Sequence, residues 1–108
     1  MIEWINEREL DRDDYVLIEV DPVKLIERTV LSENGRPLIW SPKRFQEMLI
    51  RLLLGGEIDA PVVSHSTNKI FFVDGRHRTA AALVLGLSTI KVMAHKEEAE
   101  AIRLLLLE

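Results

Sequence analysis

The stretch from Lys69 to Ala82 constrains the fold of this chain more than any other. Its first five residues are mostly apolar and aromatic, which is typical of a buried strand. A single glycine, Gly75, then leads into a helix start with two arginines and a histidine, and three alanines follow. Because small side chains let a helix lie close to a sheet, we expect this helix start to be held rigidly at the strand end.

The helix start after Gly75 is predicted to bind an anion. The first N–H groups of a helix lack internal partners, and its N-terminus carries about half a positive charge. Arg76, His77 and Arg78 add donors at this point and favour a phosphate ligand. The alternative is a helix start whose basic residues face solvent, although basic residues are more favourable at a helix C-terminus.

The length of 108 residues fits one domain over residues 1–108, with residues 1–14 as an N-terminal extension. Hydrophobic residues at 47% and charged residues at 30% are typical of a soluble globular protein. No membrane segment is expected, and the N-terminus lacks the pattern of a secretion signal, so a cytoplasmic location is predicted. The absence of cysteine excludes disulfides and a thiol nucleophile.

The pattern of elements predicts an α+β fold with a small mixed sheet packed against about four helices. Asp21-Pro22 and Ser41-Pro42 each combine a capping side chain with a proline at the first helical position, so each predicts a helix start. The second of these helices is expected to end at Gly55-Gly56. Further helices are predicted after Gly75 and over residues 96–107. Strands are expected at residues 15–20, 61–65, 69–74 and 88–94.

The residues from Pro61 to Val92 resemble the core of the ParB/sulfiredoxin superfamily. Gly75, Arg78 and Ala81 match its phosphate-binding pattern G-x-x-R-x-x-A, set between a strand and a helix that is followed by Gly86 and another strand. The resemblance extends in element order from about Tyr15 to the C-terminus and implies a ParB/sulfiredoxin-like fold.

The resemblance implies binding of a nucleotide's phosphates at the helix start, with ATP in sulfiredoxins and CTP in partition proteins. Gly75, His77 and Arg78 align with the sulfiredoxin motif Gly-Cys-His-Arg, and the helix after Ser41 aligns with the one that contacts the nucleoside. The expected ligand is ATP or another NTP with Mg²⁺. The expected nucleotide-binding residues are Lys43, Arg44, Gln46, Gly75, Arg76, His77, Arg78 and Thr79.

The chain departs from the family in its chemistry. The cysteine of the sulfiredoxin motif is replaced by Arg76, so reduction of a sulfinic acid, which needs a thiolate, is excluded. The chain also lacks a helix-turn-helix domain and the Glu-Asn motif of partition proteins. These absences argue against specific operator binding and a CTP-gated clamp.

Asp74, His77 and Arg78 are the candidate catalytic residues. Phosphoryl transfer needs charge neutralisation around the moving group, usually with Mg²⁺ held by a carboxylate, and Asp74 is the expected metal ligand. The alternative for Asp74 is to cap the helix or pair with Arg78. His77 is a candidate proton shuttle or phosphate donor, and its alternative is an imidazole hydrogen-bonded within the turn.

The residues around this turn carry further expectations. Trp40 is either a stacking face for a base or an anchor to the core. The segment from Ser32 to Trp40 is expected to be a loop or irregular hairpin beside the site, with Arg36 as a weaker basic candidate. Lys43 and Arg44 either extend the basic cleft or are solvated. Gly75→Val is expected to abolish binding in a domain that still folds.

Three functions from different classes follow from these residues. The first is an ATPase or NTPase with possible non-specific nuclease activity, linked to plasmid or DNA biology through the resemblance. The second is a small-molecule kinase on the same fold, and the third is a non-catalytic module that binds a protein partner or forms a homodimer. The formal charge of −4 means that any DNA contact is local, weak and non-specific.

Overall fold

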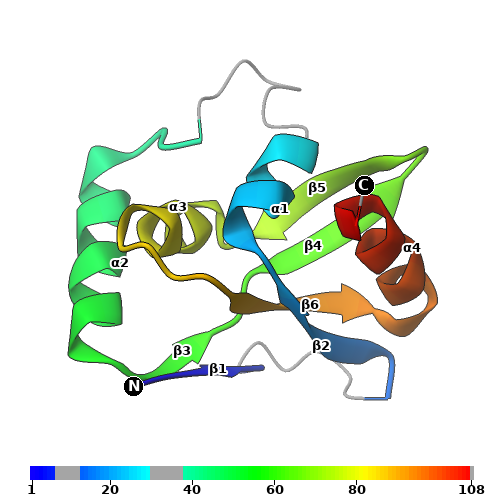
Figure 1. Ribbon diagram of the computed structural model, residues 1–108. Helices are drawn as coiled ribbons and strands as arrows, with labels where there is room; N and C mark the ends of the chain where they lie inside the picture. Colours follow the sequence, from blue (N-terminus) through cyan, green and yellow to red (C-terminus); the bar gives the residue numbers. More distant parts are fainter. Residues whose placement is uncertain (7–12, 30–37, 108) are drawn as a thin grey trace.

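The computed structural model describes residues 1–6, 13–29 and 38–107. Over these residues it has four helices and six strands, which confirms the predicted α+β class (Figure 1). The helices are α1 (Pro22–Arg28), α2 (Pro42–Leu54), α3 (Arg76–Val84) and α4 (Lys96–Leu107). The strands are β1 (Ile2–Ile5), β2 (Tyr15–Val20), β3 (Gly56–Asp59), β4 (Val62–Ser66), β5 (Lys69–Asp74) and β6 (Ile90–His95).

The main sheet is mixed, as predicted, with the strand order β2-β6-β4-β5. Its outer pairs, β2 with β6 and β4 with β5, are antiparallel, whereas β4 and β6 are parallel. The β4–β5 turn is a tight hairpin at Thr67 and Asn68, whose φ angles of 50° and 63° suit such a turn. After this turn, β5 runs antiparallel to β4 and leads directly into α3.

Both predicted capping motifs are confirmed. The Asp21 carboxylate accepts a hydrogen bond from the Val23 N–H at 2.8 Å, and the Ser41 hydroxyl accepts one from the Arg44 N–H at 3.3 Å. A proline follows each cap, and α2 ends at Gly55, which has a φ angle of 75°. Local sequence alone therefore determines where α1 and α2 begin.

The pairing of β1 with β3 was not predicted. Residues 2–5, which we expected to belong to an extension, form a parallel pair with residues 56–59, and Ile58 is almost fully buried there. The expected loop over Ser32–Trp40, with Arg36, falls largely on residues 32–37, which lie outside the described residues.

The helices surround the sheet and form the core with it. The small side chains of α3 are fully buried, and α3 packs against α2 and α1. Helix α4 packs against β2, β4 and β6, and its Glu98 carboxylate accepts hydrogen bonds from the Ser64 hydroxyl and the His65 N–H. The Glu98 carboxylate thereby links α4 to β4. Among the described residues, no helix has the length and apolarity needed to span a bilayer.

Candidate phosphate-binding site

Gly75 forms the turn between β5 and α3 and packs against the start of β4. Its φ angle is 94°, in the left-handed region that favours glycine. A Cβ atom at this position would lie 2.5 Å from both the Cα and the Cβ of Pro61. The expectation that Gly75→Val leaves the domain folded is therefore corrected, because a side chain here overlaps the backbone of a neighbouring segment.

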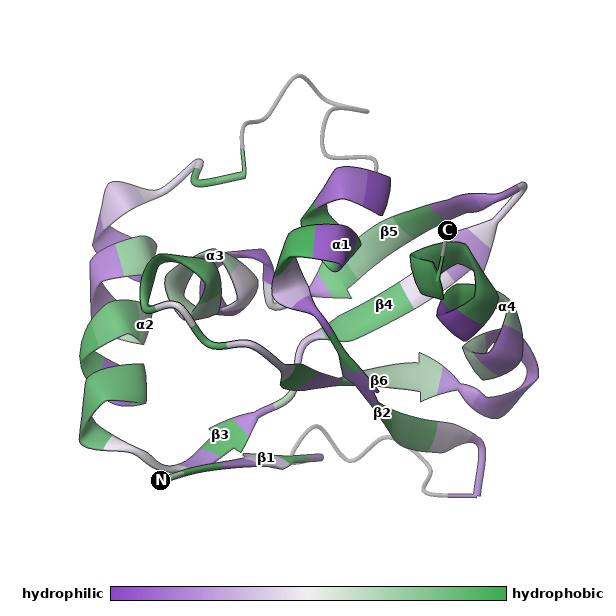
Figure 2. Ribbon diagram, in the orientation of Figure 1, coloured by the Kyte–Doolittle hydropathy of each residue, from purple (hydrophilic) through white to green (hydrophobic). Residues whose placement is uncertain are grey.

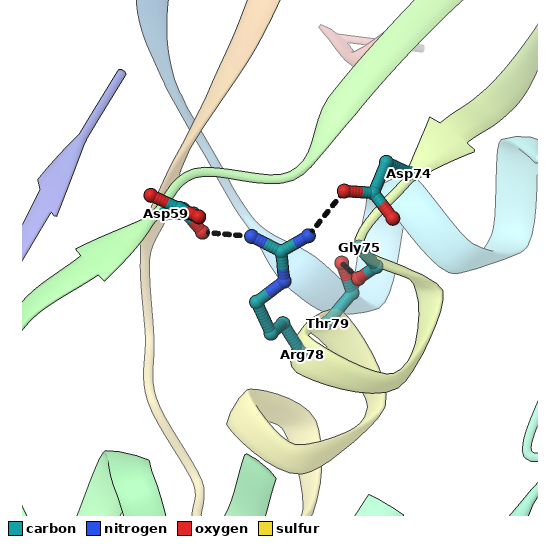
Figure 3. Close-up of polar contacts among 5 residues, drawn as sticks. All are labelled: Asp59, Asp74, Gly75, Arg78 and Thr79. Atoms are coloured by element: carbon teal, nitrogen blue, oxygen red, sulfur yellow. Dashed lines mark hydrogen bonds and ion pairs between the residues drawn. The ribbon is translucent and has the colours of Figure 1, made fainter. Parts of the chain in front are cut away.

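Arg78 is buried between two carboxyl-bearing residues, Asp59 and Asp74 (Figure 3). One guanidinium nitrogen lies 2.7 Å from the Asp74 carboxylate, and the other donates a hydrogen bond to the backbone carbonyl of Asp59. The Arg78 side chain is 10% exposed and that of Asp74 is 39% exposed. Arg78 thus joins α3 to the ends of β3 and β5, and Asp74 pairs with it as the alternative interpretation anticipated.

Thr79 faces the interior of the same turn. Its hydroxyl and its backbone N–H both donate to the Gly75 carbonyl at 3.0 Å, and the residue is fully buried. The side chain therefore fixes the shape of the turn rather than contacting solvent.

His77 connects α3 to α2. Its Nε2 atom accepts a hydrogen bond of 3.1 Å from the backbone N–H of Ser41, the cap of α2. An imidazole nitrogen that accepts cannot carry a proton, so the neutral ring in this geometry is protonated on Nδ1. Burial lowers the pKa of His77 below its ordinary value of 6.5, and the positive charges of Arg44 and Arg76 lower this pKa further.

The hydrogen bond between Ser41 and His77 links the cap of α2 to the first turn of α3, and the two helices pack against each other. Trp40 lies beside this bond, with its ring 5.3 Å from the His77 ring and 5.0 Å from the Arg44 guanidinium carbon. We call this region, made of Trp40, Ser41, Arg44, Arg76 and His77, the two-helix junction. The junction concentrates positive charge, because the partial positive charge at each helix N-terminus adds to the full charges of Arg44 and Arg76.

The other predicted binding residues lie outside this junction. Lys43 and Gln46 are exposed on the first two turns of α2, whereas Arg78 and Thr79 are buried beneath the turn at Gly75. Of the eight predicted residues, Lys43, Arg44 and Gln46 are exposed on α2 and Arg76 is partly exposed, whereas Gly75, His77, Arg78 and Thr79 are buried.

The sequence did not predict the hydrogen bond of Ser41 to His77 or that of Asp59 to Arg78. Ser41 was predicted as a cap, but its N–H also binds His77. Asp59 contributes through its backbone carbonyl, which leaves no signal in the sequence. One of its buried carboxylate oxygens has no hydrogen-bond partner within the described part of the chain.

The acidic groups near the site fit only one mode of magnesium binding. Among the described residues, no three histidine or acidic side chains group together as a metal site. Asp74 is a single, partly exposed carboxylate already paired with Arg78. Mg²⁺ is often held by one or two carboxylates together with substrate phosphates and water, so Asp74 fits an ion that arrives with a nucleotide.

Comparisons with known proteins do not extend this description. No family model, curated protein or solved structure matches the chain.

Proposed function

We propose that this protein binds the phosphate groups of a nucleoside di- or triphosphate, ATP or another NTP, at the two-helix junction. The observation that carries the proposal is the hydrogen bond from the Ser41 N–H to His77 Nε2, which holds the starts of α2 and α3 together. Two converging helix N-termini attract an anion more strongly than one, because their partial charges add. Arg44 and Arg76 supply the full charges that a polyphosphate needs.

The resemblance to the ParB/sulfiredoxin superfamily supports the same proposal. Gly75 of the G-x-x-R-x-x-A pattern occupies the strand-to-helix turn in a left-handed conformation. The buried position of Arg78 changes how the pattern is interpreted for this chain. We assign Arg78 to the support of the turn, and we assign direct phosphate contact to Arg44 and Arg76, with Lys43 as an exposed neighbour.

Hydrolysis of the nucleotide is the activity we propose to follow binding. Asp74 would hold Mg²⁺ together with the phosphates, and the ion would neutralise phosphate charge when bound. His77 would orient a phosphate rather than take a proton at Nε2, since that atom already accepts the Ser41 N–H. The same basic junction would give a cytoplasmic protein weak, sequence-independent contact with DNA, and with it a route to non-specific nuclease activity.

A non-catalytic binding module is the second candidate, and the Asp74–Arg78 ion pair favours it. A carboxylate oxygen that already holds an arginine at 2.7 Å must share or give up that partner to bind a metal ion. Release of inorganic phosphate from ATP separates the two candidates: an NTPase releases phosphate, and Asp74→Asn abolishes the release, whereas a binding module retains ATP intact.

The binding proposal is tested by calorimetry with a nucleotide panel, with and without Mg²⁺. Arg44→Gln and Arg76→Gln should each weaken binding by at least about tenfold, because each removes a charge-assisted hydrogen bond worth roughly 1.5–3 kcal/mol. Arg51→Gln is the matched control, since Arg51 is exposed in the last turn of α2, away from the junction. Absence of binding at millimolar nucleotide, or an equal loss in the Arg51 control, would contradict the proposal.

A further inference from the structure

A cavity of about 300 Å³ lies between β1 and the face of the main sheet formed by β2 and β6. Its size is at the lower end of the range for ligand pockets, so it suits a small molecule. Its lining includes Ile2 and Trp4 of β1, Glu19 of β2, Leu87 and Thr89 after α3, and Lys91 of β6. The two-helix junction lies at the other end of α3, about 13 Å away along the helix, so the cavity is a separate site.

Glu19 and Lys91 lie directly opposite each other on β2 and β6. Their neighbours Ile18, Val20 and Val92 are buried in the main core, whereas Glu19 and Lys91 are exposed. Figure 2 shows this alternation as hydrophilic bands among the hydrophobic residues of β2 and of the start of β6. Because successive side chains of a strand point to opposite faces, both charged groups project from the face opposite to the main core, with Cβ atoms about 5 Å apart.

Neither of these charged groups is paired in the part of the chain that the structure describes. No ion pair joins Glu19 to Lys91, although the two residues face each other, and neither side chain has a hydrogen-bond partner there. The hydroxyl of Thr89 is likewise without a partner among the described residues. The other lining residues, Trp4 and Leu87 among them, are apolar or aromatic. A few polar groups set against an apolar wall are the usual pattern of a small-molecule site.

We propose that this cavity binds a free α-amino acid with an apolar side chain. The Glu19 carboxylate accepts hydrogen bonds from the ammonium group of the ligand. The Lys91 ammonium donates to the carboxylate of the ligand, and the Thr89 hydroxyl is a second donor to it. The apolar side chain of the ligand packs against the wall that contains Trp4 and Leu87.

The arrangement of charges selects a zwitterion. A simple anion would face the Glu19 carboxylate, and a simple cation would face the Lys91 ammonium, whereas a zwitterion matches both groups. An α-amino acid carries its two charges on groups attached to one carbon atom, which suits two side chains directly opposite each other. A residue inside a peptide carries neither charge, so the ligand is the free amino acid. This proposal does not depend on nucleotide binding at the two-helix junction.

An NMR titration of the ¹⁵N-labelled protein with L-leucine tests the site. The chain has two tryptophans, so their indole N–H resonances give a reporter in the cavity, Trp4, and an internal control at the two-helix junction, Trp40. Trp40→Phe assigns the two signals. We expect L-leucine to move the Trp4 resonance to saturation and to leave the Trp40 resonance in place. N-acetyl-L-leucine and L-leucine amide each lack one charge and should bind at least about threefold more weakly.

Substitutions of the charged residues test the role of each group. Glu19→Gln and Lys91→Gln should each weaken L-leucine binding at least about threefold. Glu57→Gln and Lys69→Gln should leave it unchanged, because these exposed strand residues lie outside the cavity lining. Glu19→Lys should bind N-acetyl-L-leucine in preference to L-leucine amide, since it places a second cation where the carboxylate was.

All four substituted side chains are exposed, so the folded state should persist, and circular dichroism checks this. A Trp4 resonance that stays in place up to about 10 mM L-leucine would overturn the proposal. Equal binding of L-leucine and its two singly charged derivatives would overturn it as well, and so would an equal loss of binding in the Glu57 and Lys69 controls.

Discussion

At the scale of single residues, Arg78 shows how one pattern supports two interpretations. The spacing G-x-x-R-x-x-A predicted its importance, but the structure surrounds its guanidinium with the Asp74 carboxylate and the Asp59 carbonyl. Its position was therefore predictable from sequence, whereas its partner on β3 was not, because a backbone carbonyl 19 residues away leaves no signal in the sequence.

Arg78→Ala should lower the free energy of unfolding by about 2 kcal/mol, because it removes the hydrogen bonds of the buried guanidinium to the Asp74 carboxylate and to the Asp59 carbonyl. Arg103→Ala is the control: its ion pair with Glu100 is exposed, so we expect a change within about 0.5 kcal/mol. Urea denaturation measures both. An Arg78→Ala variant as stable as the control would show that the buried pair does not support the fold.

At the scale of elements, caps and periodicity predicted most of the fold, and pairing between distant segments accounts for the rest. The starts of α1 and α2 are determined by Asp21 and Ser41, which act on N–H groups two or three residues away. The β1–β3 pair was missed because each strand has four residues and exists only through its partner some fifty residues along the chain. The convergence of α2 and α3 was likewise invisible, since Ser41 and His77 meet only in the folded chain.

The turn between β5 and α3 gives a prediction at this scale. Gly75→Ala should destabilise the protein more than Gly86→Ala, although both glycines have positive φ angles. At Gly86 a Cβ atom would meet none of the residues that the structure describes within 4 Å, so only backbone strain of about 1 kcal/mol is expected. At Gly75 the overlap with Pro61 adds to this strain. Thermal and urea unfolding compare the two variants, and equal losses of stability would refute the packing role of Gly75.

At the scale of the whole molecule, α2 joins a charged end to an apolar end. Its N-terminus forms the two-helix junction with α3, and its last turn exposes Leu53 and Leu54. The 13 residues of α2 separate these ends by about 20 Å, so a polar substitution at Leu53 should leave nucleotide binding unchanged, as calorimetry with ATP can check.

The location of the bound phosphate is the central claim, and His77 reports on it. With its lowered pKa, His77 is neutral at pH 7 and Nε2 accepts the Ser41 N–H. A phosphate bound beside the ring would stabilise its protonated form and raise this pKa, and a proton on Nε2 would then replace the hydrogen bond from Ser41. Because the complex then takes up a proton more readily than the free protein, nucleotide affinity should increase as the pH falls from 6.5 towards the lowered pKa of His77.

An NMR titration of the three histidines, with and without saturating ATP, measures this effect directly. The account predicts that ATP raises the pKa of His77 and leaves the ring resonances of His65 and His95, which lie in β4 and β6 outside the two-helix junction, at their positions without ATP. Saturating ATP that leaves the pKa of His77 unchanged, or that moves only the resonances of His65 or His95, would place the nucleotide elsewhere and contradict the proposed site.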